Sequence, residues 1–345
     1  MRALTVTPGK ADSLRLVDDA PEPSPDEGEV LVEAVAVGIC GTDGEILGGD
    51  YGEPPPGRDT LVLGHESLGR VVEDPSGTTR PGDLVAGIVR RPDPVPCRYC
   101  AAGEWDMCTN GRYTECGIKG IDGFARQRWR VPAEYAVPLR PELGLAGVLL
   151  EPTSVVAKAW DHVDKIGARG FWAPQRVLVT GAGPIGLLAA LLSVQRGLET
   201  HVLARGTSGP KPELARRLGA TYHAVPVEEL DFDPDVIIEC TGAPPVVREV
   251  FSKLAPNGIG CLTGINAKAH HIELDLNELN RCLVLKNNVL FGTVNANRRH
   301  WRQAADALAR ADHDWLMGLI THRYGLDDFQ RAYAEEEGIK TVIEF

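Results

Sequence analysis

The second half of the chain alternates between short apolar runs and longer segments whose apolar residues recur at helical spacing. Short β-branched runs are typical of buried strands, and strands alternating with helices build a doubly wound parallel sheet. The pattern predicts six strands, at residues 177–179, 201–204, 222–224, 235–239, 259–265 and 289–294. The helices predicted among them span residues 187–195, 213–218 and 245–254.

The chain up to about residue 140 has a different pattern, in which many short strand-like runs are separated by turns. Two strands are predicted within residues 1–20, the second at 14–17, and the apolar run 29–39 predicts a long, mostly buried strand. Near the C-terminus, 298–311 predicts an amphipathic helix, 327–333 another helix and 340–345 a final strand. The fold class is therefore α/β, with a β-rich domain and a six-stranded doubly wound domain.

A glycine motif, Gly181-Ala-Gly183-Pro184-Ile185-Gly186, follows the first strand of the predicted sheet and opens its first helix. In a dinucleotide-binding fold the first glycine permits the tight turn, and the second lets the backbone approach a pyrophosphate. The third lets the helix sit close to the strand, and the helix N-terminus offers free N–H groups to phosphate. A glycine-rich turn is the simpler explanation of the motif alone, but six strands around it favour a dinucleotide site.

Arg205 stands at the end of the second predicted strand. Chains that bind NAD usually carry Asp or Glu there for the ribose hydroxyls, whereas an arginine suits the 2′-phosphate of NADP. Lys211 follows closely and adds positive charge. We therefore expect NADP as the cofactor, with use of NAD left open. The alternative is that Arg205 is a solvated loop residue.

The composition is that of a globular protein with an excess of acidic residues. Of the 345 residues 43% are hydrophobic and 24% are charged, and the formal net charge is −12. Such a charge disfavours nucleic acid as a partner. No apolar run approaches the roughly 20 residues that a membrane span needs, and the N-terminus does not resemble a signal peptide. We therefore expect a cytoplasmic protein that binds neither nucleic acid nor membrane.

Cys40, His65 and Glu66 form the first candidate metal site. A thiolate, an imidazole and a carboxylate suit zinc, and three protein ligands leave a fourth position open for water or substrate. Taken singly, Cys40 is as well explained as a small buried side chain, and the His-Glu pair as part of a loop. Their joint occurrence ahead of a nucleotide-binding domain favours the metal.

Four of the eight cysteines fall within one short window, which indicates metal binding before disulfides. Cys97, Cys100 and Cys108 have the spacing of a closed, structural zinc site, which requires a fourth ligand. Asp93 is near in sequence and is the first candidate for it, and Cys116 is the second. A lobe held by loop packing, without a metal, is the alternative.

Two segments, Gly38-Ile-Cys-Gly-Thr-Asp43 and Gly64-His-Glu-Ser-Leu-Gly69, together with the cysteine lobe and the glycine motif, resemble the zinc-dependent medium-chain alcohol dehydrogenases. The resemblance covers essentially the whole chain. Several further stretches resemble the glucose 1-dehydrogenase branch, namely 90–92, 115–124, 151–152, 294–295 with His300, and 338–345. The resemblance implies a GroES-like catalytic domain at residues 1–155, to which 296–345 return, and a dinucleotide-binding (Rossmann) domain at 156–295. It also implies an active site between the two.

The resemblance also implies roles for single residues. It places catalytic zinc on Cys40, His65 and Glu66, with Glu151 as a further ligand or as the group that holds the zinc-bound water. Glu151 alone, before Pro152, is also typical of a helix N-terminus. The remaining implied roles are proton transfer by Thr42, sugar contacts by Glu115 and His300, a position near the nicotinamide for Asn295, and cofactor contacts by Thr241 and Lys340. Alone, a histidine at this position is more often a residue of a helix surface.

The chain departs from the family pattern at three positions. Pro94 stands where the first of four lobe cysteines is usual, and Val89 and Val155 stand where some sugar-oxidising relatives carry polar groups. These departures bear on the metal content of the lobe and on the choice of sugar. Because the relatives are dimers or tetramers, we expect a homo-oligomer of one of these sizes.

The reaction implied is oxidation of an aldose, D-glucose first, at C1 to the lactone, with hydride transfer to NADP. Zinc would act as a Lewis acid, and the cofactor carries the hydride chemistry. A polyol, aminocyclitol or other secondary-alcohol dehydrogenase on the same frame is the nearest alternative. The intact Cys40, His65 and Glu66 argue against a zinc-free reductase, and the intact glycine motif argues against a non-catalytic relative.

Overall fold

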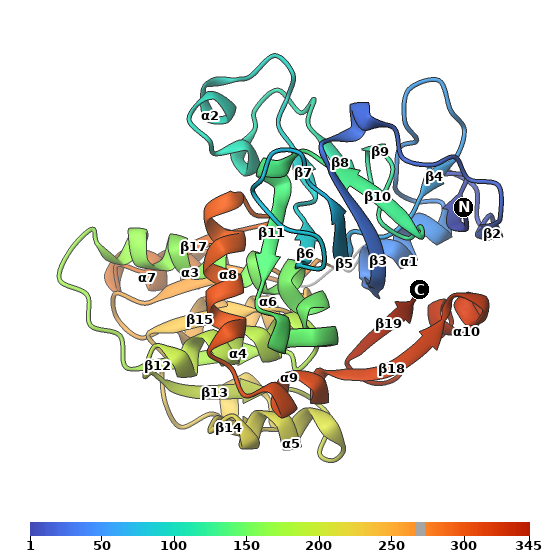
Figure 1. The fold of residues 1–345 in the computed structure, drawn as a ribbon. Helices are drawn as coiled ribbons and strands as arrows, with labels where there is room; N and C mark the ends of the chain where they lie inside the picture. Colours follow the sequence, from blue (N-terminus) through green and yellow to red (C-terminus); the bar gives the residue numbers. More distant parts are fainter. Residues whose placement is uncertain (266–272) are drawn as a thin grey trace. The chain divides into compact units, whose positions relative to one another are not determined.

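The computed structural model describes residues 1–265 and 273–345. The chain divides into two compact units, Met1–Ser154 together with Asn295–Phe345, and Val155–Val294. The C-terminal segment thus belongs with the N-terminal one, and in Figure 1 the red strands β18 (Ile320–Gly325) and β19 (Lys340–Glu344) carry the end of the chain. Both units consist of a sheet with helices, which confirms the predicted fold class.

The second unit contains a six-stranded sheet in the order β14-β13-β12-β15-β16-β17, with parallel pairing throughout. All six predicted strands are present, with small shifts at their ends. The order reverses at β12, which is the arrangement that binds dinucleotides at the carboxyl ends of the strands. The strands are β12 (Arg176–Thr180), β13 (Glu199–Leu203), β14 (Thr221–His223), β15 (Val236–Glu239), β16 (Ile259–Leu262) and β17 (Val289–Gly292).

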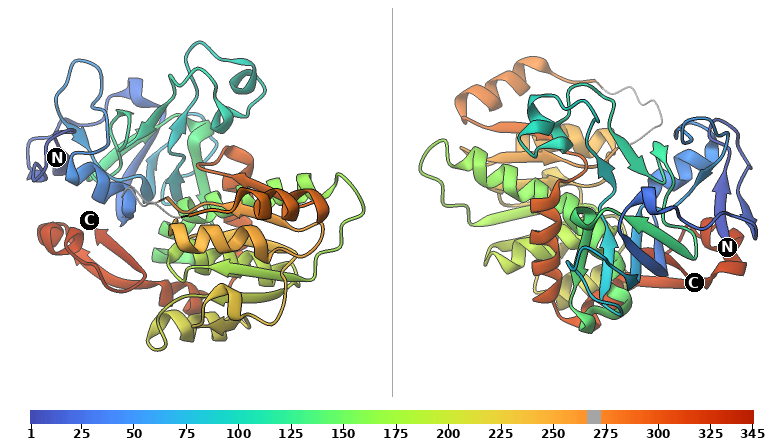
Figure 2. Two further views of the ribbon diagram at one scale, coloured as in Figure 1. Left: turned by 180° about the vertical axis from the view of Figure 1, so that it is seen from behind. Right: turned by 45° about the horizontal axis from the view of Figure 1, so that its top comes forward.

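Helices line both faces of this sheet (Figures 1 and 2). They are α3 (Leu150–Gly167), α4 (Pro184–Gln195), α5 (Pro210–Arg217), α6 (Pro244–Lys253) and α7 (Leu276–Leu285). The three predicted helices are confirmed as α4, α5 and α6, whereas α3 and α7 were not predicted. A core on one side of the sheet includes Leu178 of β12, Ile237 of β15 and Val250 of α6.

The first unit is built on a seven-stranded sheet in the order β11-β6-β5-β3-β19-β18, with β10 also paired to β3. The long strand β3 (Val30–Ile39) lies at its centre, as the continuous apolar run predicted. The other new strands are β5 (Glu66–Glu73), β6 (Leu84–Gly87), β10 (Arg128–Val131) and β11 (Ala136–Leu139). Two smaller sheets contain β1 (Ala3–Val6), β2 (Arg15–Val17) and β4 (Leu61–Val62), and β7 (Arg90–Arg91), β8 (Thr114–Cys116) and β9 (Gly120–Ile121).

The helices of the first unit are short, apart from α8 (Arg298–Ala309), which confirms the predicted amphipathic helix. The others are α1 (Gly41–Gly48), α2 (Arg98–Ala101), α9 (His313–Leu319) and α10 (Phe329–Tyr333). The helix predicted at 327–333 is a 3₁₀ turn, Leu326–Asp328, followed by α10. Across the residues that the structure describes, no helix combines the length and the apolar character needed to cross a bilayer.

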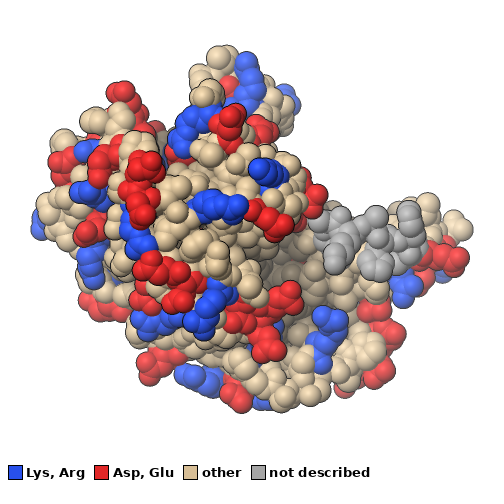
Figure 3. All heavy atoms as spheres, turned by 90° about the vertical axis from the view of Figure 1, so that its right-hand side faces the viewer, with Lys and Arg blue, Asp and Glu red and all other residues tan. Residues whose placement is uncertain are grey.

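Acidic and basic side chains are interspersed over the face of the molecule seen in Figure 3. Opposite charges therefore lie close together there, and the face does not present the continuous basic surface that nucleic acids select.

Candidate active site

Helix α1 positions the first candidate metal ligand. Its sequence, GTDGEILG, is rich in glycine and has a low intrinsic helix propensity. The helix starts because Asp43, in its first turn, accepts a hydrogen bond at Oδ2 from the backbone N–H of Cys40 at 2.9 Å. That contact closes the N-terminus in the manner of a capping box. It also fixes Cys40 at the point where β3 ends.

Three ligand atoms converge at this helix start. The Sγ of Cys40 lies 2.9 Å from Nε2 of His65, and Nδ1 of His65 lies 3.6 Å from Oδ1 of Asp43. Cys40, Asp43 and His65 each offer a ligand atom within 4.8 Å of the other two. Sequence reasoning missed Asp43, although its position three residues after Cys40 is the signal for a capping carboxylate.

Two atoms of this cluster show that the donor set fits zinc. Nδ1 of His65 and Oδ1 of Asp43 are buried, and neither has a hydrogen-bond partner among the described residues. A histidine that binds zinc through Nε2 characteristically donates its Nδ1–H to a carboxylate. The pair is already oriented for that contact, so zinc on Cys40 and His65 would use Nε2 and leave Nδ1 for Asp43.

Glu66, the third predicted ligand, is engaged elsewhere. Both of its carboxylate oxygens lie 2.7 Å from Nζ of Lys340, and the two side chains are 1% and 2% exposed. The carboxylate lies over Gly38 on β3, where a Cβ would overlap its Oε2. The sequence resemblance put Lys340 at the cofactor; the structure instead directs its ammonium to Glu66, because β19 lies next to β3 in the sheet.

Glu151 adds a further carboxylate from the first turn of α3. Burial raises its pKa to about 7; the charge of His65 opposes the rise and the charge of Glu66 adds to it. Burial alone would lower the pKa of His65, but the charges of Cys40 and Asp43 outweigh burial and hold it well above its ordinary value. The site therefore concentrates negative charge, which a divalent cation would neutralise.

Two of the predicted substrate and cofactor residues meet at a second place in the first unit. The amide Nδ2 of Asn295 donates to Oε1 of Glu115 at 2.7 Å, and Nε of Arg90 donates to the same oxygen at 3.0 Å. The Arg90 guanidinium stacks 3.8 Å from the centre of the Tyr113 ring. Glu115 is thus a buried, oriented acceptor. Asn295 is held in the left-handed region, with φ of 61°, directly where the chain returns to this unit.

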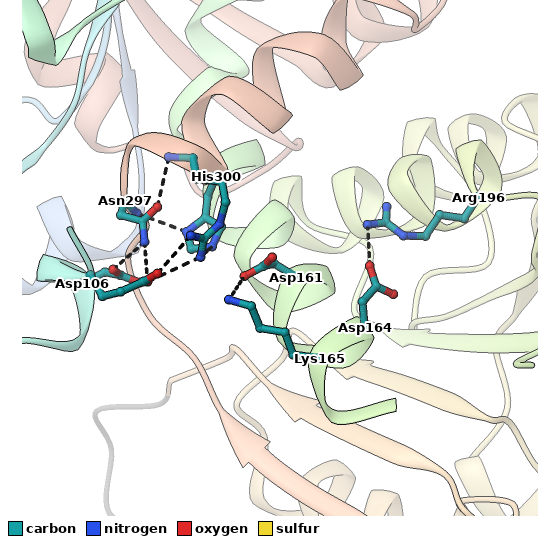
Figure 4. Close-up of polar contacts among 9 residues, drawn as sticks. Asp106, Asp161, Asp164, Lys165, Arg196, Asn297 and His300 are labelled. Carbon is teal, nitrogen blue, oxygen red and sulfur yellow. Dashed lines mark hydrogen bonds and ion pairs between the residues drawn. The ribbon is translucent and has the colours of Figure 1, made fainter. Parts of the chain in front are cut away.

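His300 lies inside the protein rather than on the helix surface. It is 0% exposed, and its Nδ1 accepts the backbone N–H of Asn297 at 3.2 Å in the first turn of α8. The Nδ2 of Asn297 donates to Glu104 and to Asp106, at 2.8 and 2.9 Å. Figure 4 shows Asn297 and His300 facing Asp106 of the cysteine lobe. The contact of His300 with a sugar stays a prediction.

The second cysteine cluster is confined to a single lobe. The sulfurs of Cys97, Cys100 and Cys108 lie within 4.8 Å of one another, and those of Cys97 and Cys100 are 3.6 Å apart. The backbone N–H of Cys100 lowers the pKa of Cys97 to about 6, whereas burial raises that of Cys100 to about 11. Three thiols in this arrangement offer three of the four ligands of a tetrahedral zinc site.

The fourth ligand expected from the sequence is not part of this cluster. The carboxylate of Asp93 accepts hydrogen bonds from the backbone of Val95, from Asn110 and from Arg112. These three donors occupy its oxygens, and among the described residues the metal-ligand group at this place contains thiols only. Cys116, the second candidate, is buried in β8 and does not join the group either.

The glycine motif has the geometry that a dinucleotide site requires. Gly181 has a φ of 94°, and a Cβ at Gly186 would overlap the carbonyl oxygen of Gly181. Gly183 is the N-cap of α4 with open space at its Cβ position, and Pro184 and Ile185 form the first turn. The turn, the open backbone and the close helix packing thus fall at the expected glycines.

Arg205 follows β13 and is exposed, at the carboxyl edge of the same sheet. Lys211 is half-buried in the first turn of α5. Thr241 lies in the loop after β15, and its backbone N–H donates to Glu239 at 2.7 Å. All three residues therefore follow strands on the edge where the glycine motif lies, so the second unit alone contains the expected cofactor residues other than Asn295 and Lys340.

Two family models match successive parts of the chain. Residues 144–345 match the model of the glucose dehydrogenase C-terminus, and residues 26–141 match that of the alcohol dehydrogenase GroES-like domain. Glucose 1-dehydrogenase 2 of Vulcanisaeta moutnovskia is 40% identical over 352 residues, covering 100% of this chain and 99% of that protein. Glucose 1-dehydrogenase of Methanocella arvoryzae is 38% identical, with the same coverage.

A solved structure gives the same result. The glucose dehydrogenase of Haloferax mediterranei in complex with NADP, Zn and gluconolactone aligns with a TM-score of 0.91 at 34% identity, covering 100% of this chain and 99% of that one. Full-length identity of this extent, together with the two family models, identifies the chain as a member of the glucose dehydrogenase family of zinc-dependent medium-chain dehydrogenases.

Proposed function

We propose that this protein oxidises an aldose, D-glucose first, at C1 to the lactone and passes the hydride to NADP. The observation that carries the proposal is the cluster of Cys40, His65 and Asp43, in which the two buried, unpartnered atoms, Nδ1 of His65 and Oδ1 of Asp43, face each other as in a zinc-bound histidine with its carboxylate partner. The family membership and the arginine that follows β13 support the sugar and the phosphorylated cofactor, respectively.

The side chains of the cluster have different roles in metal binding. Cys40 and His65 bind it, and Asp43 holds His65 in the tautomer that leaves Nε2 free. Lys340 neutralises the charge of Glu66 in this structure. For Glu66 or Glu151 to become a further zinc ligand, its carboxylate would have to leave its present position. Zinc, when bound, lowers the pKa of the sugar C1 hydroxyl, and the nicotinamide accepts the hydride.

The remaining residues position the sugar and its proton. Thr42, half-buried in the first turn of α1 beside Cys40, receives the hydroxyl proton at Oγ1 and passes it outward. Glu115, oriented by Arg90 and Asn295, accepts a hydroxyl of the sugar. His300, in the first turn of α8, contacts the sugar. The roles of Glu115 and His300 depend on hydroxyl groups that a sugar carries besides the reacting one and that ethanol lacks.

The direct test is a substrate panel with the purified, zinc-loaded protein. NADPH formation is followed with D-glucose, D-galactose, D-xylose, a polyol and ethanol, and NAD is run in parallel. The proposal predicts the highest kcat/KM with D-glucose and NADP, and a loss of the preference for NADP in Arg205→Ala. Turnover of a polyol or of ethanol but of no aldose would contradict the sugar assignment and keep the alternative dehydrogenase.

We further propose that the protein is a homo-oligomer that uses the open edge of the second unit's sheet. Strand β17 ends the strand order, and helix α7 exposes Leu276, Val284 and Leu285 at 68%, 63% and 71%. Exposed apolar side chains beside an unpaired strand are typical of an interface between subunits. Light scattering should give a dimer or tetramer, and Leu285→Glu should shift it toward the monomer.

The compartment proposed is the cytoplasm. All eight cysteines are free thiols, and reduced thiols are typical of a reducing compartment.

A further inference from the structure

Glu239 is a fully buried carboxylate in the middle of the parallel sheet. It is the last residue of β15 and is 0% exposed. In the sheet register it lies between Thr180, the last residue of β12, and Leu262, the last residue of β16. It therefore marks the carboxyl edge of the sheet, at the point where the strand order reverses.

The carboxylate is held by four donors that carry no full charge. Its Oε1 accepts from the hydroxyl of Thr180 at 3.2 Å, from the backbone N–H of Thr241 at 2.7 Å and from the Thr241 hydroxyl. Its Oε2 accepts the backbone N–H of Gly242 at 3.1 Å. Two backbone N–H groups, which can only donate, point at the two oxygens, and such donors favour the charged form of a carboxylate. These four contacts satisfy the oxygens without neutralising the charge.

Glu239 also connects three loops through its hydrogen bonds. Its backbone carbonyl accepts the N–H groups of Thr263 and Gly264 at 2.8 and 3.1 Å, which ends β16 at Leu262 instead of at the predicted residue 265. The loop after β15 presses against both neighbours. A Cβ at Gly264 would overlap the backbone of Gly242, and a Cβ at Gly181 would lie 3.1 Å from the methyl group of Thr241. Glu239 thus holds the loops that follow β12, β15 and β16.

Two of these loops, those that follow β15 and β16, belong to the half of the sheet that receives the nicotinamide. A doubly wound sheet consists of two mononucleotide-binding halves. Arg205, which suits the adenosine 2′-phosphate, follows β13 in the first half. The half that contains β15, β16 and β17 therefore receives the nicotinamide mononucleotide. The oxidised nicotinamide ring carries a positive charge that the reduced ring lacks.

We propose that Glu239 is a positioning residue for the nicotinamide half and that its buried charge makes the protein bind the oxidised cofactor in preference to the reduced one. This inference rests on the proposed function only in requiring that the second unit binds NADP. None of the described side chains that donate to Glu239 carries a full charge, and a buried charge of this kind acts over several ångströms, so it distinguishes a cationic ring from a neutral one. A purely structural side chain would affect both forms equally.

The test compares the dissociation constants of NADP⁺ and NADPH by calorimetry, with the zinc-loaded protein. Glu239→Gln keeps the shape and removes the charge. We expect it to weaken NADP⁺ binding about tenfold more than NADPH binding, on the scale of one charge interaction at such a site. Glu199→Gln is the matched control, because this glutamate is 54% exposed at the opposite, amino end of β13. It should leave the ratio unchanged.

A second variant keeps the proposal falsifiable if Glu239→Gln does not fold. Thr180→Val removes one donor from the carboxylate and leaves its charge less compensated, so the ratio should move about twofold in the opposite direction. Equal weakening of the two forms in Glu239→Gln, or an unchanged ratio in Thr180→Val, would overturn the proposal. Failure of the wild-type protein to bind either form would instead contradict the proposed function.

Discussion

The two cysteine-containing clusters of the first unit are held by different means. Cys40, Asp43 and His65 come from the ends of strands that pair across the central sheet, and Asp43 and His65 are buried. Cys97, Cys100 and Cys108 come from one continuous segment and are packed less deeply, with Cys100 alone buried. The first cluster mixes thiol, imidazole and carboxylate, whereas the second contains thiols only.

This difference separates the two clusters by function. Mixed ligands with an open position are typical of catalytic zinc, and thiolate sets are typical of structural zinc. The paired strands keep the first cluster organised without metal. The lobe is held by local turns and by contacts of residues 104–106 with Arg90, Tyr135 and the N-cap of α8. We therefore expect loss of the first cluster to stop the reaction, and loss of the second to loosen one lobe.

The largest effect should come from removing one thiol of each cluster. Cys40→Ala should lower kcat/KM for D-glucose by at least about a thousandfold, because metal catalysis supplies several kcal/mol of the barrier reduction. Cys97→Ala is the matched variant and should keep turnover within about tenfold at 25 °C. Steady-state kinetics measure both. Equal losses of kcat/KM in the two variants would contradict the assignment of different functions to the two clusters.

The next effect concerns the buried ion pair beside the first cluster. Lys340→Met leaves the carboxylate of Glu66 buried without its partner, which should cost about 3–5 kcal/mol of unfolding free energy in the metal-free protein. Arg323→Met, on the neighbouring strand β18, breaks an exposed pair with Glu344 and should cost about 1 kcal/mol or less. Urea denaturation compares them. Similar costs would show that burial does not set the strength of this pair.

Asp43 should affect metal affinity rather than folding. Asp43→Asn removes the carboxylate that faces Nδ1 of His65, and zinc affinity should fall about 10–100-fold, as is usual for such outer partners. Asp50→Asn, just after α1 and exposed, is the control. Competition with a chromophoric chelator measures the affinity. A zinc affinity equal to that of the control variant would exclude Asp43 as the partner of a metal-bound histidine.

The smallest effect is a pH dependence within the lobe. Because the pKa of Cys97 is lowered from 9.0 to about 6, its thiolate is favoured in the folded, metal-free protein. This contribution to lobe stability is present above pH 9 and is lost as the pH falls toward 6. Alkylation of Cys97, followed by peptide mass, should rise with a midpoint of about 6, and that of Cys100 with one of about 11. A midpoint near 9 for Cys97 would contradict the lobe geometry.

The second unit could be predicted in detail from the sequence. Its strands, three of its helices and its glycine motif depend on local patterns, namely β-branched runs, helical spacing and glycines at fixed offsets. Helix α7 was not predicted, although its apolar residues recur at helical spacing; in the structure none of its residues is buried. Strand β16 was predicted too long because a carbonyl of the neighbouring strand captures the N–H groups of Thr263 and Gly264.

The first unit was less predictable because its site depends on sheet neighbours. No local pattern tells that β19 pairs with β3, and that pairing alone brings Lys340 to Glu66. Asp93 shows the limit of reasoning from nearness in sequence. The role of Asp93 as a fourth zinc ligand stays a prediction, and in this structure its carboxylate accepts the backbone N–H of Val95, two residues on. Local turns of this kind compete with metal binding for short acidic side chains.

The most direct test is a crystal structure of the zinc-loaded protein with anomalous diffraction at the zinc absorption edge. The account predicts a peak bonded to Sγ of Cys40 and to Nε2 of His65, with Nδ1 of His65 donating to Asp43. A peak among Cys97, Cys100 and Cys108 in addition would show that the lobe is loaded as well. Zinc among those three thiols alone, with Cys40 and His65 still in contact with each other, would contradict the account.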